Sequence, residues 1–127
     1  MKFKGVNSKG QLVFGEGYVK YNENLLCLVN NLDDLKNADN IIEENTLCES
    51  IKGFYDKNNN ILYNNDIIKI SLNDIERYFL ISFRDGAYNY INGNNISLLK
   101  DVNLEFEIIG NKFIDKDLLN KCLRRNE

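Results

Sequence analysis

The sequence predicts a mainly β fold, a small antiparallel barrel or curled antiparallel sheet that ends in a short C-terminal helix. Three observations support this prediction. About eight short segments rich in β-branched and aromatic residues are separated by Gly, Asn and Asp turns. Long helical segments do not alternate with them, which disfavours a parallel α/β fold. A helical period appears only near the C-terminus.

The first 30 residues are predicted as strands, with Phe3 opening the first and a turn at Gly10. Leu12–Phe14 and Tyr18–Tyr21 supply β-branched and aromatic residues between glycines. The polar turn at residues 22–24 then leads into Leu25–Val29. We therefore expect an antiparallel hairpin of residues 18–21 and 25–29.

The central region predicts a loop followed by two strands. Residues 32–40 contain too few apolar positions for a stable helix, so we expect a loop in which Asp33 or Asp34 caps one short turn. Residues 41–51 and 61–70 are each predicted as one strand, and Asp and Asn residues form a turn before the second.

The remaining strands are predicted from a turn signal and from alternation. Residues 78–83 and 87–91 flank Asp85 and Gly86, which is typical of a two-residue hairpin. Residues 104–109 alternate apolar side chains with Glu, which predicts a last strand.

The C-terminal residues predict a short amphipathic helix. Asp115 or Asp117 suits its N-cap, and basic residues follow in its last turn. The apolar residues at helical spacing are Leu118, Leu119, Cys122 and Leu123.

We expect one domain, residues 1–127. The chain has no proline, repeat or linker-like tract that would mark a boundary. A chain of this length buries roughly two-thirds of the surface that it exposes when unfolded, which suits a single core.

The composition predicts a protein of the bacterial host cytoplasm. No apolar run approaches the roughly 20 residues that cross a bilayer, and residues 1–5 lack the apolar stretch of a signal peptide. The three cysteines, Cys27, Cys48 and Cys122, have no motif spacing, which predicts reduced thiols. Abundant Asn, Ile and Lys residues are typical of the AT-rich genes of a low-GC bacterium or its phages.

The residue inventory excludes several chemistries, and we expect no enzyme, cofactor or metal site. The chain has no histidine, which removes Ser-His-Asp and Cys-His nucleophile sites. Residues 56–60 resemble the opening of a calcium loop, but Ile61 replaces the required Gly and Ile67 the required Glu. Asp56 and Asn58 are better interpreted as turn formers.

A carboxylate-based enzyme is kept as a remote alternative. Asp56 with Asp66, or Glu105 with Glu107, could in principle form an acid–base pair. Nothing in the sequence distinguishes these residues from turn-forming or solvated acids.

The net charge of −3 provides no global basic field for nucleic acid. A local basic cluster at the chain ends is the candidate for such binding, with Tyr and Phe residues available for stacking. Its members are Lys2, Lys4, Lys121, Arg124 and Arg125.

The stretch from Thr46 to Lys69 resembles the central motif of the YopX family, which runs roughly T-L-C-Q-Y-T-G-L-x-D-K-N-G-x-x-I-Y-E-G/N-D-I-V. Residues 2–5 with 12–15 resemble the opening of that family, and residues 107–111 resemble its closing E-V-I-G-N. The turn glycine of the family is Asn59 here, and its tryptophan is Leu12. The motif residues singled out are Gly53, Asp56, Asn58, Tyr63, Asp66, Gly110 and Asn111.

The resemblance implies a phage or prophage accessory protein with a small SH3-like barrel, and it brings no catalytic residues to carry over. The motif residues are interpreted as scaffold. The favoured hypothesis is a protein-interaction or assembly module that binds a protein partner or self-associates, because aromatic residues at strand edges make good interface anchors. The alternative is a nucleic-acid-binding accessory protein of phage replication or regulation.

Overall fold

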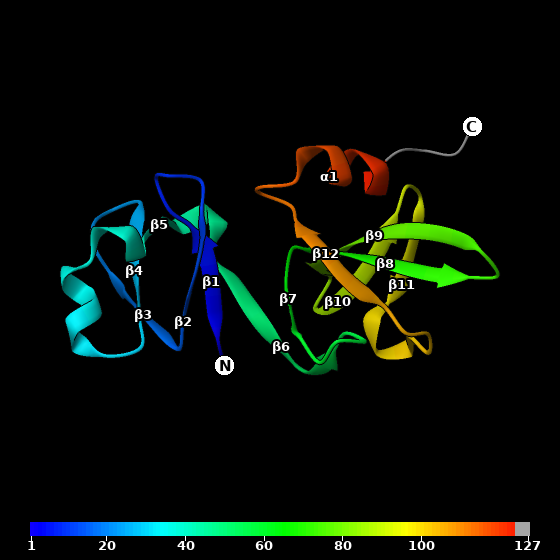
Figure 1. The fold of residues 1–127 in the computed structure, drawn as a ribbon, viewed down its shortest axis with the longest axis horizontal. Coiled ribbons are helices and arrows are strands. Elements are labelled where there is room, and N and C mark those ends of the chain that lie inside the picture. The colour runs from blue at the N-terminus through cyan, green and yellow to red at the C-terminus, as the bar shows by residue number, and fades with distance from the viewer. Residues whose placement is uncertain (124–127) are drawn as a thin grey trace. The chain divides into compact units, whose positions relative to one another are not determined.

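The computed structural model describes residues 1–123 and confirms the predicted fold class. The chain is mainly β, with curled antiparallel sheets and one short C-terminal α-helix (Figure 1). Residue contacts divide it into two compact units, Met1–Lys52 and the part that begins at Gly53. Each unit is described separately.

The first unit is a small curled β structure. β1 pairs with β2 and β6, while β4 pairs with β3 and β5. A bridge between Asn7 and Ile42 joins the end of β1 to β5, so the strands curl around one core. Its elements are β1 (Phe3–Val6), β2 (Leu12–Gly15), β3 (Gly17–Lys20), β4 (Leu25–Val29), η1 (Leu32–Lys36), η2 (Ala38–Asn40), β5 (Ile41–Glu43), η3 (Glu44–Thr46) and the first part of β6 (Cys48–Tyr55).

The core of this unit is aliphatic. Leu26, Leu28 and Ile42 are buried, and Phe3 and Val13 pack against them. Gly5 faces the same core, where a Cβ atom would overlap the Ile42 side chain. The predicted hairpin of residues 18–21 and 25–29 is confirmed as the β3–β4 pair.

Two predictions for the first unit were wrong. Residues 32–40 form two 3-10 helices instead of a loop, because Asn31 and Asp34 cap η1 reciprocally and the Asn37 side chain caps η2. Residues 41–51 do not form one strand, because η3 interrupts them where the Thr46 hydroxyl donates to the Glu43 carbonyl at 2.7 Å.

The second unit is built on a five-stranded antiparallel sheet with the order β11-β10-β9-β8-β12. α1 covers one face of this sheet, where Cys122 packs with Ile67 and Leu80 (Figure 1). The elements of the unit are the end of β6, β7 (Ile61–Tyr63), β8 (Asp66–Leu72), β9 (Ile75–Arg84), β10 (Ala87–Asn92), β11 (Asn95–Leu98), η4 (Leu99–Asp101), β12 (Glu107–Asn111) and α1 (Lys116–Leu123).

The hairpin predicted around Asp85 and Gly86 is confirmed, as is the C-terminal helix. The single strand predicted at 61–70 is divided, because Asn65 takes a positive φ of 70° and the Asp66 carboxylate accepts from the Tyr63 N–H at 2.8 Å. The last strand starts at Glu107 rather than at Leu104. No helix in residues 1–123 is long and apolar enough to span a membrane.

Candidate functional site

The best-formed candidate site is a pocket of about 420 Å³ in the second unit, on the sheet face opposite α1. Side chains two residues apart along β8 and β9 share this face, which follows from the period of a strand. The pocket is lined by Ile70, Leu72, Asn73, Ile75, Arg77, Phe79, Tyr90, Ser97, Val102, Asn103 and Leu104. Its volume lies within the range of known ligand sites.

The pocket walls are mostly apolar and accessible. Leu72 and Ile75 are each 53% exposed, and Leu104 is 41% exposed. Phe79 and Tyr90 form an edge-to-face aromatic pair with ring centroids 5.2 Å apart. Burying such side chains against a partner would stabilise a complex.

Arg77 is the one charged residue among those that line the pocket. Its Nη1 contacts the Glu76 carbonyl oxygen at 3.4 Å. Within residues 1–123 no carboxylate lies at ion-pair distance from its guanidinium. The site therefore combines apolar walls with a cation that has no acidic partner in the described part of the chain.

The opposite face of the same strands shows the contrasting arrangement. Lys69 Nζ lies 3.3 Å from Glu107 Oε1 and 3.6 Å from Glu76 Oε1. The hydrogen bond to Glu107 and the charge of Glu76 raise the pKa of Lys69. Lys69 is thus paired with two carboxylates, whereas Arg77 has no carboxylate at ion-pair distance within residues 1–123 and can receive an external anion.

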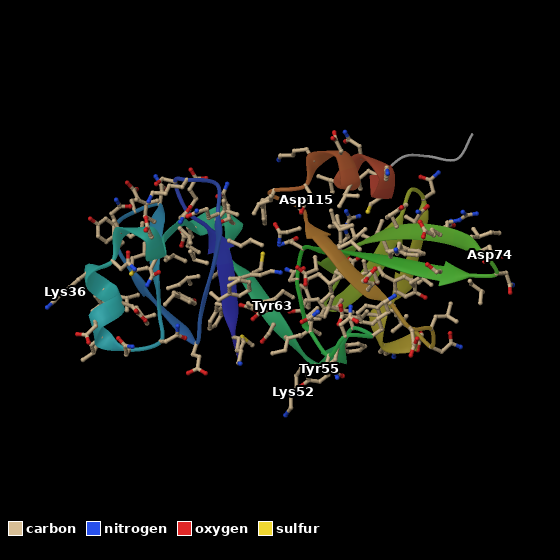
Figure 2. All side chains as sticks on the ribbon, viewed as in Figure 1. Lys36, Lys52, Tyr55, Tyr63, Asp74 and Asp115 are labelled. Carbon is tan, nitrogen blue, oxygen red and sulfur yellow. The ribbon has the colours of Figure 1, made fainter. Side chains whose placement is uncertain are left out.

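The β8–β9 hairpin that carries the pocket floor ends in a two-residue turn. Asn73 and Asp74 both have positive φ, at 53° and 64°, which Asn and Asp tolerate better than other non-glycine residues. Figure 2 shows Asp74 at the tip of this hairpin. The turn places Leu72 and Ile75 opposite each other at the outer end of the pocket.

The family-motif residues form a separate hydrogen-bonded framework. Asp56 is buried, its Oδ1 accepts from the Asn58 and Asn60 N–H groups at 2.9 Å, and its Oδ2 accepts from the Ile108 N–H at 3.1 Å. Burial acts to raise the pKa of Asp56, but the hydrogen bonds from Asn60, Ile108 and Asn58 outweigh it and hold the pKa below its usual value. The carboxylate thus joins its own turn to β12.

Three further motif residues, Asp66, Gly110 and Asn111, lie on β12 or pair with it. Asp66 is fully buried and lies opposite Asn111 in the β8–β12 register. Burial, and then the charge of Asp66, raises the pKa of Tyr63. The Asn111 N–H donates to Asp115 Oδ2 at 2.8 Å, and a Cβ on Gly110 would lie 2.6 Å from that oxygen. Gly53, in β6, has a φ of 86°.

The predicted basic residues fall in different parts of the chain. Lys2 is exposed in the first unit, whereas Lys4 in β1 is only 5% exposed. Lys121 is exposed on α1, with its Nζ 5.1 Å from the centroid of the Tyr78 ring. Arg124 and Arg125 lie outside the described residues.

The candidate acids and thiols are placed as follows. Asp56 accepts several hydrogen bonds, Glu107 pairs with Lys69, and Glu105 is exposed. In residues 1–123 no three acidic or thiol side chains gather as a metal site would require. The three cysteines are buried thiols, and burial raises the pKa of Cys122 to about 11.

The pocket was not predicted from the sequence, because its lining combines four strands with the loop after η4. One signal could have identified it. Ile75, Phe79 and Ile81 mark one face of β9, and Arg77 occupies the intervening position on that apolar face. A cation in such a position is expensive to bury, so it indicates an open site or a bound anion.

Comparison with known proteins supports the resemblance seen in the sequence. The family model described as YopX protein matches residues 7–120. A search among curated proteins found no match. The matched region includes the Asp56 turn, the Tyr63–Asp66 turn and β12. The chain belongs to the YopX family.

Proposed function

We propose that this chain is a phage or prophage accessory protein that acts in the bacterial host cytoplasm as a protein-interaction or assembly module. The observation that carries the proposal is the apolar pocket formed on strands β8 to β11, in which the side chains of Leu72, Ile75 and Leu104 are about half exposed. An exposed apolar concavity with a few polar groups suits the side chains of a protein partner.

A binding role is favoured over catalysis by the chemistry of the pocket. Its lining contains an arginine, amides and hydroxyls, but no carboxylate, thiol or imidazole that could act as a general base at neutral pH. The buried Asp56 carboxylate already accepts hydrogen bonds from its own turn and from β12. We therefore propose that the protein is not an enzyme.

The test compares two matched leucine substitutions. Leu72→Ser removes an apolar side chain from the pocket, and Leu32→Ser removes one of 82% exposure from the first unit. Each full-length variant and the unchanged chain would be immobilised and exposed to lysate of the phage-infected host. Light scattering of each variant would report self-association.

We expect the unchanged chain and Leu32→Ser to retain the same protein, or to form the same oligomer, and Leu72→Ser to bind at least about tenfold more weakly. If Leu72→Ser retained the same protein as strongly as the unchanged chain does, the pocket would not be the binding site. A monodisperse monomer that retains no protein would contradict the proposed function.

Nucleic-acid binding is the second candidate, supported by the exposure of Lys2 and Lys121. Labelled single- and double-stranded DNA and RNA at low salt would test it. Binding should weaken steeply as salt rises, with Lys2→Glu and Lys121→Glu each reducing it. Absence of binding at low salt would exclude this candidate.

A further inference from the structure

The outer half of β9 has an unpaired edge beside the pocket. β9 pairs with β8 from Ile75 to Leu80, but it pairs with β10 only from Leu80 to Arg84. At the point where β10 ends, the Gly93 N–H donates to the Cys122 carbonyl oxygen of α1. Residues 75–79 of β9 therefore have a strand on one side only.

The register tells which backbone groups face this open edge. Arg84 and Ala87 flank a two-residue turn and form a hydrogen-bonded pair. Every second residue of β9 from Arg84, namely Ser82 and Leu80, therefore also directs its backbone N–H and C=O groups toward β10. The same alternation directs the N–H groups of Tyr78 and Glu76 toward the open edge. The register with β8, counted from the turn at Asn73 and Asp74, gives the same result.

These N–H groups have no acceptor among residues 1–123. The carbonyl of Tyr78 accepts from Asn92 Nδ2 at 2.8 Å, so the pairing with β10 ends in a side-chain contact. An unpaired edge of this kind is what an extended peptide uses when it adds a strand to a sheet.

Arg77 lies between the two positions whose backbone faces the edge. A residue of an added strand opposite Arg77 would occupy a non-hydrogen-bonded pair, in which side chains are closest, and it would share the pocket face. Because Arg77 has no carboxylate partner in the described chain, an acidic side chain at that place would complete an ion pair. Residues two before and two after the acid would also point to the pocket face, beside Ile75 and Phe79.

We propose that the open edge of β9 binds an extended segment of a partner protein that carries an Asp or Glu between two apolar residues, in the pattern apolar-x-acid-x-apolar. Arg77 then determines specificity for the acid, and the pocket receives the apolar residues. This inference rests on the proposed function and names the chemistry of the partner.

The test is a selection from displayed heptapeptides on the immobilised full-length chain. The central position varies over all amino acids, the positions two before and two after are Val, Ile, Leu or Phe, and the others are Ser or Thr. Arg77→Glu reverses the pocket charge. Arg84→Glu is the matched control, since Arg84 is an exposed arginine of the same strand outside the pocket.

We expect the unchanged chain and Arg84→Glu to enrich Asp and Glu at the centre at least tenfold over Lys and Arg, and Arg77→Glu to reverse this preference. If Arg77→Glu does not fold, Arg77→Gln replaces it and should show no charge preference. In a selected peptide, N-methylation of the two residues adjacent to the acid should reduce binding at least tenfold, because their N–H groups face β9.

The outcomes separate this inference from the proposed function. Enrichment of apolar peptides without an acid, unchanged by Arg77→Glu, would refute the acidic pattern while the interaction module stands. Absence of any enriched peptide would refute the binding of an extended segment at β9, while the lysate retention and light scattering described above would still decide the proposed function. Binding of a labelled oligothymidylate that is lost in Arg77→Glu would assign Arg77 to phosphate and overturn the peptide proposal.

Discussion

At the scale of single residues, the Asp56 carboxylate joins a local turn to a strand about fifty positions away. Oδ1 holds the turn through Asn58 and Asn60, and Oδ2 reaches the Ile108 N–H of β12. A turn former in this position therefore also determines tertiary structure. The loss of one oxygen should affect more than the turn itself.

Asp56→Asn tests this role. An amide oxygen can still accept from residues 58 and 60, but the amide nitrogen would face the Ile108 N–H, so two donors would meet in a buried place. We expect the free energy of unfolding at pH 7 to fall by about 1–3 kcal/mol, measured by urea unfolding. Asp74→Asn, at an exposed turn, is the control and should change it little.

The same carboxylate contributes to the acid sensitivity of the fold. Because the pKa of Asp56 is lower in the folded chain than in the unfolded chain, its contribution is present above the unfolded value of about 4 and is lost as the pH falls through the folded value. The stability difference between the unchanged chain and Asp56→Asn should therefore shrink below about pH 4. A difference independent of pH would contradict this account.

The sequence predicted the role of a single residue only where its hydrogen-bond partners lie close to it in the chain. Asp56 and Asn58 were interpreted as turn formers, and their bonds to the same turn agree with that interpretation. The bond to Ile108 was not predicted, because it requires the docking of β12. Arg77 was missed for the same reason, since its surroundings come from other strands and a loop.

At the scale of elements, the predicted strands were placed where alternation and turn residues agreed. The Asp85–Gly86 hairpin is an example, because both turn residues have the positive φ that such a turn requires. The breaks within 41–51 and 61–70 were missed, since they depend on the Thr46 and Asp66 side chains. Apolar periodicity does not report such side-chain bonds to the backbone.

The β12–α1 connection depends on a close approach at Gly110. An added Cβ would lie 2.6 Å from Asp115 Oδ2 and 2.9 Å from Leu118 Cδ1. The Asp115 carboxylate is fixed by the Asn111 N–H, so it cannot move away without losing that bond. The absence of a side chain at Gly110 therefore allows α1 to start against the sheet.

Gly110→Ala should shift the start of α1 and reduce the free energy of unfolding by about 1–3 kcal/mol. Amide hydrogen exchange of α1 should accelerate more than that of β9. Gly17→Ala is the matched control, since a Cβ there meets only Val29 Cγ2 at 3.9 Å. Equal stability of the two variants would show that the helix adapts without cost.

At the scale of the whole molecule, one family match extends across two compact units. The YopX model covers residues 7–120, whereas residue contacts divide the chain after Lys52. The sequence offered no sign of this division, because no proline or linker stands near it and β6 continues through it. The prediction of a single domain therefore stays a prediction, which the folding behaviour of the two cores can test.

Each unit has its own cluster of buried apolar residues, so a substitution in one cluster tests the stability of that unit. Ile42 is fully buried in the first cluster and Ile67 in the second. Truncation of either to Ala should reduce local stability by about 2–5 kcal/mol through lost burial and a cavity. We expect Ile42→Ala to accelerate amide exchange in β4 and β5, and Ile67→Ala to accelerate it in β8 and β9.

Native-state exchange of these two variants distinguishes separate cooperative units from one. If the units unfold separately, each substitution changes exchange mainly in its own unit, and the pocket strands keep their protection in Ile42→Ala. Peptide binding at β9 would then survive destabilisation of the first unit. Equal acceleration in both units by either variant would instead establish the single cooperative domain that the sequence predicts.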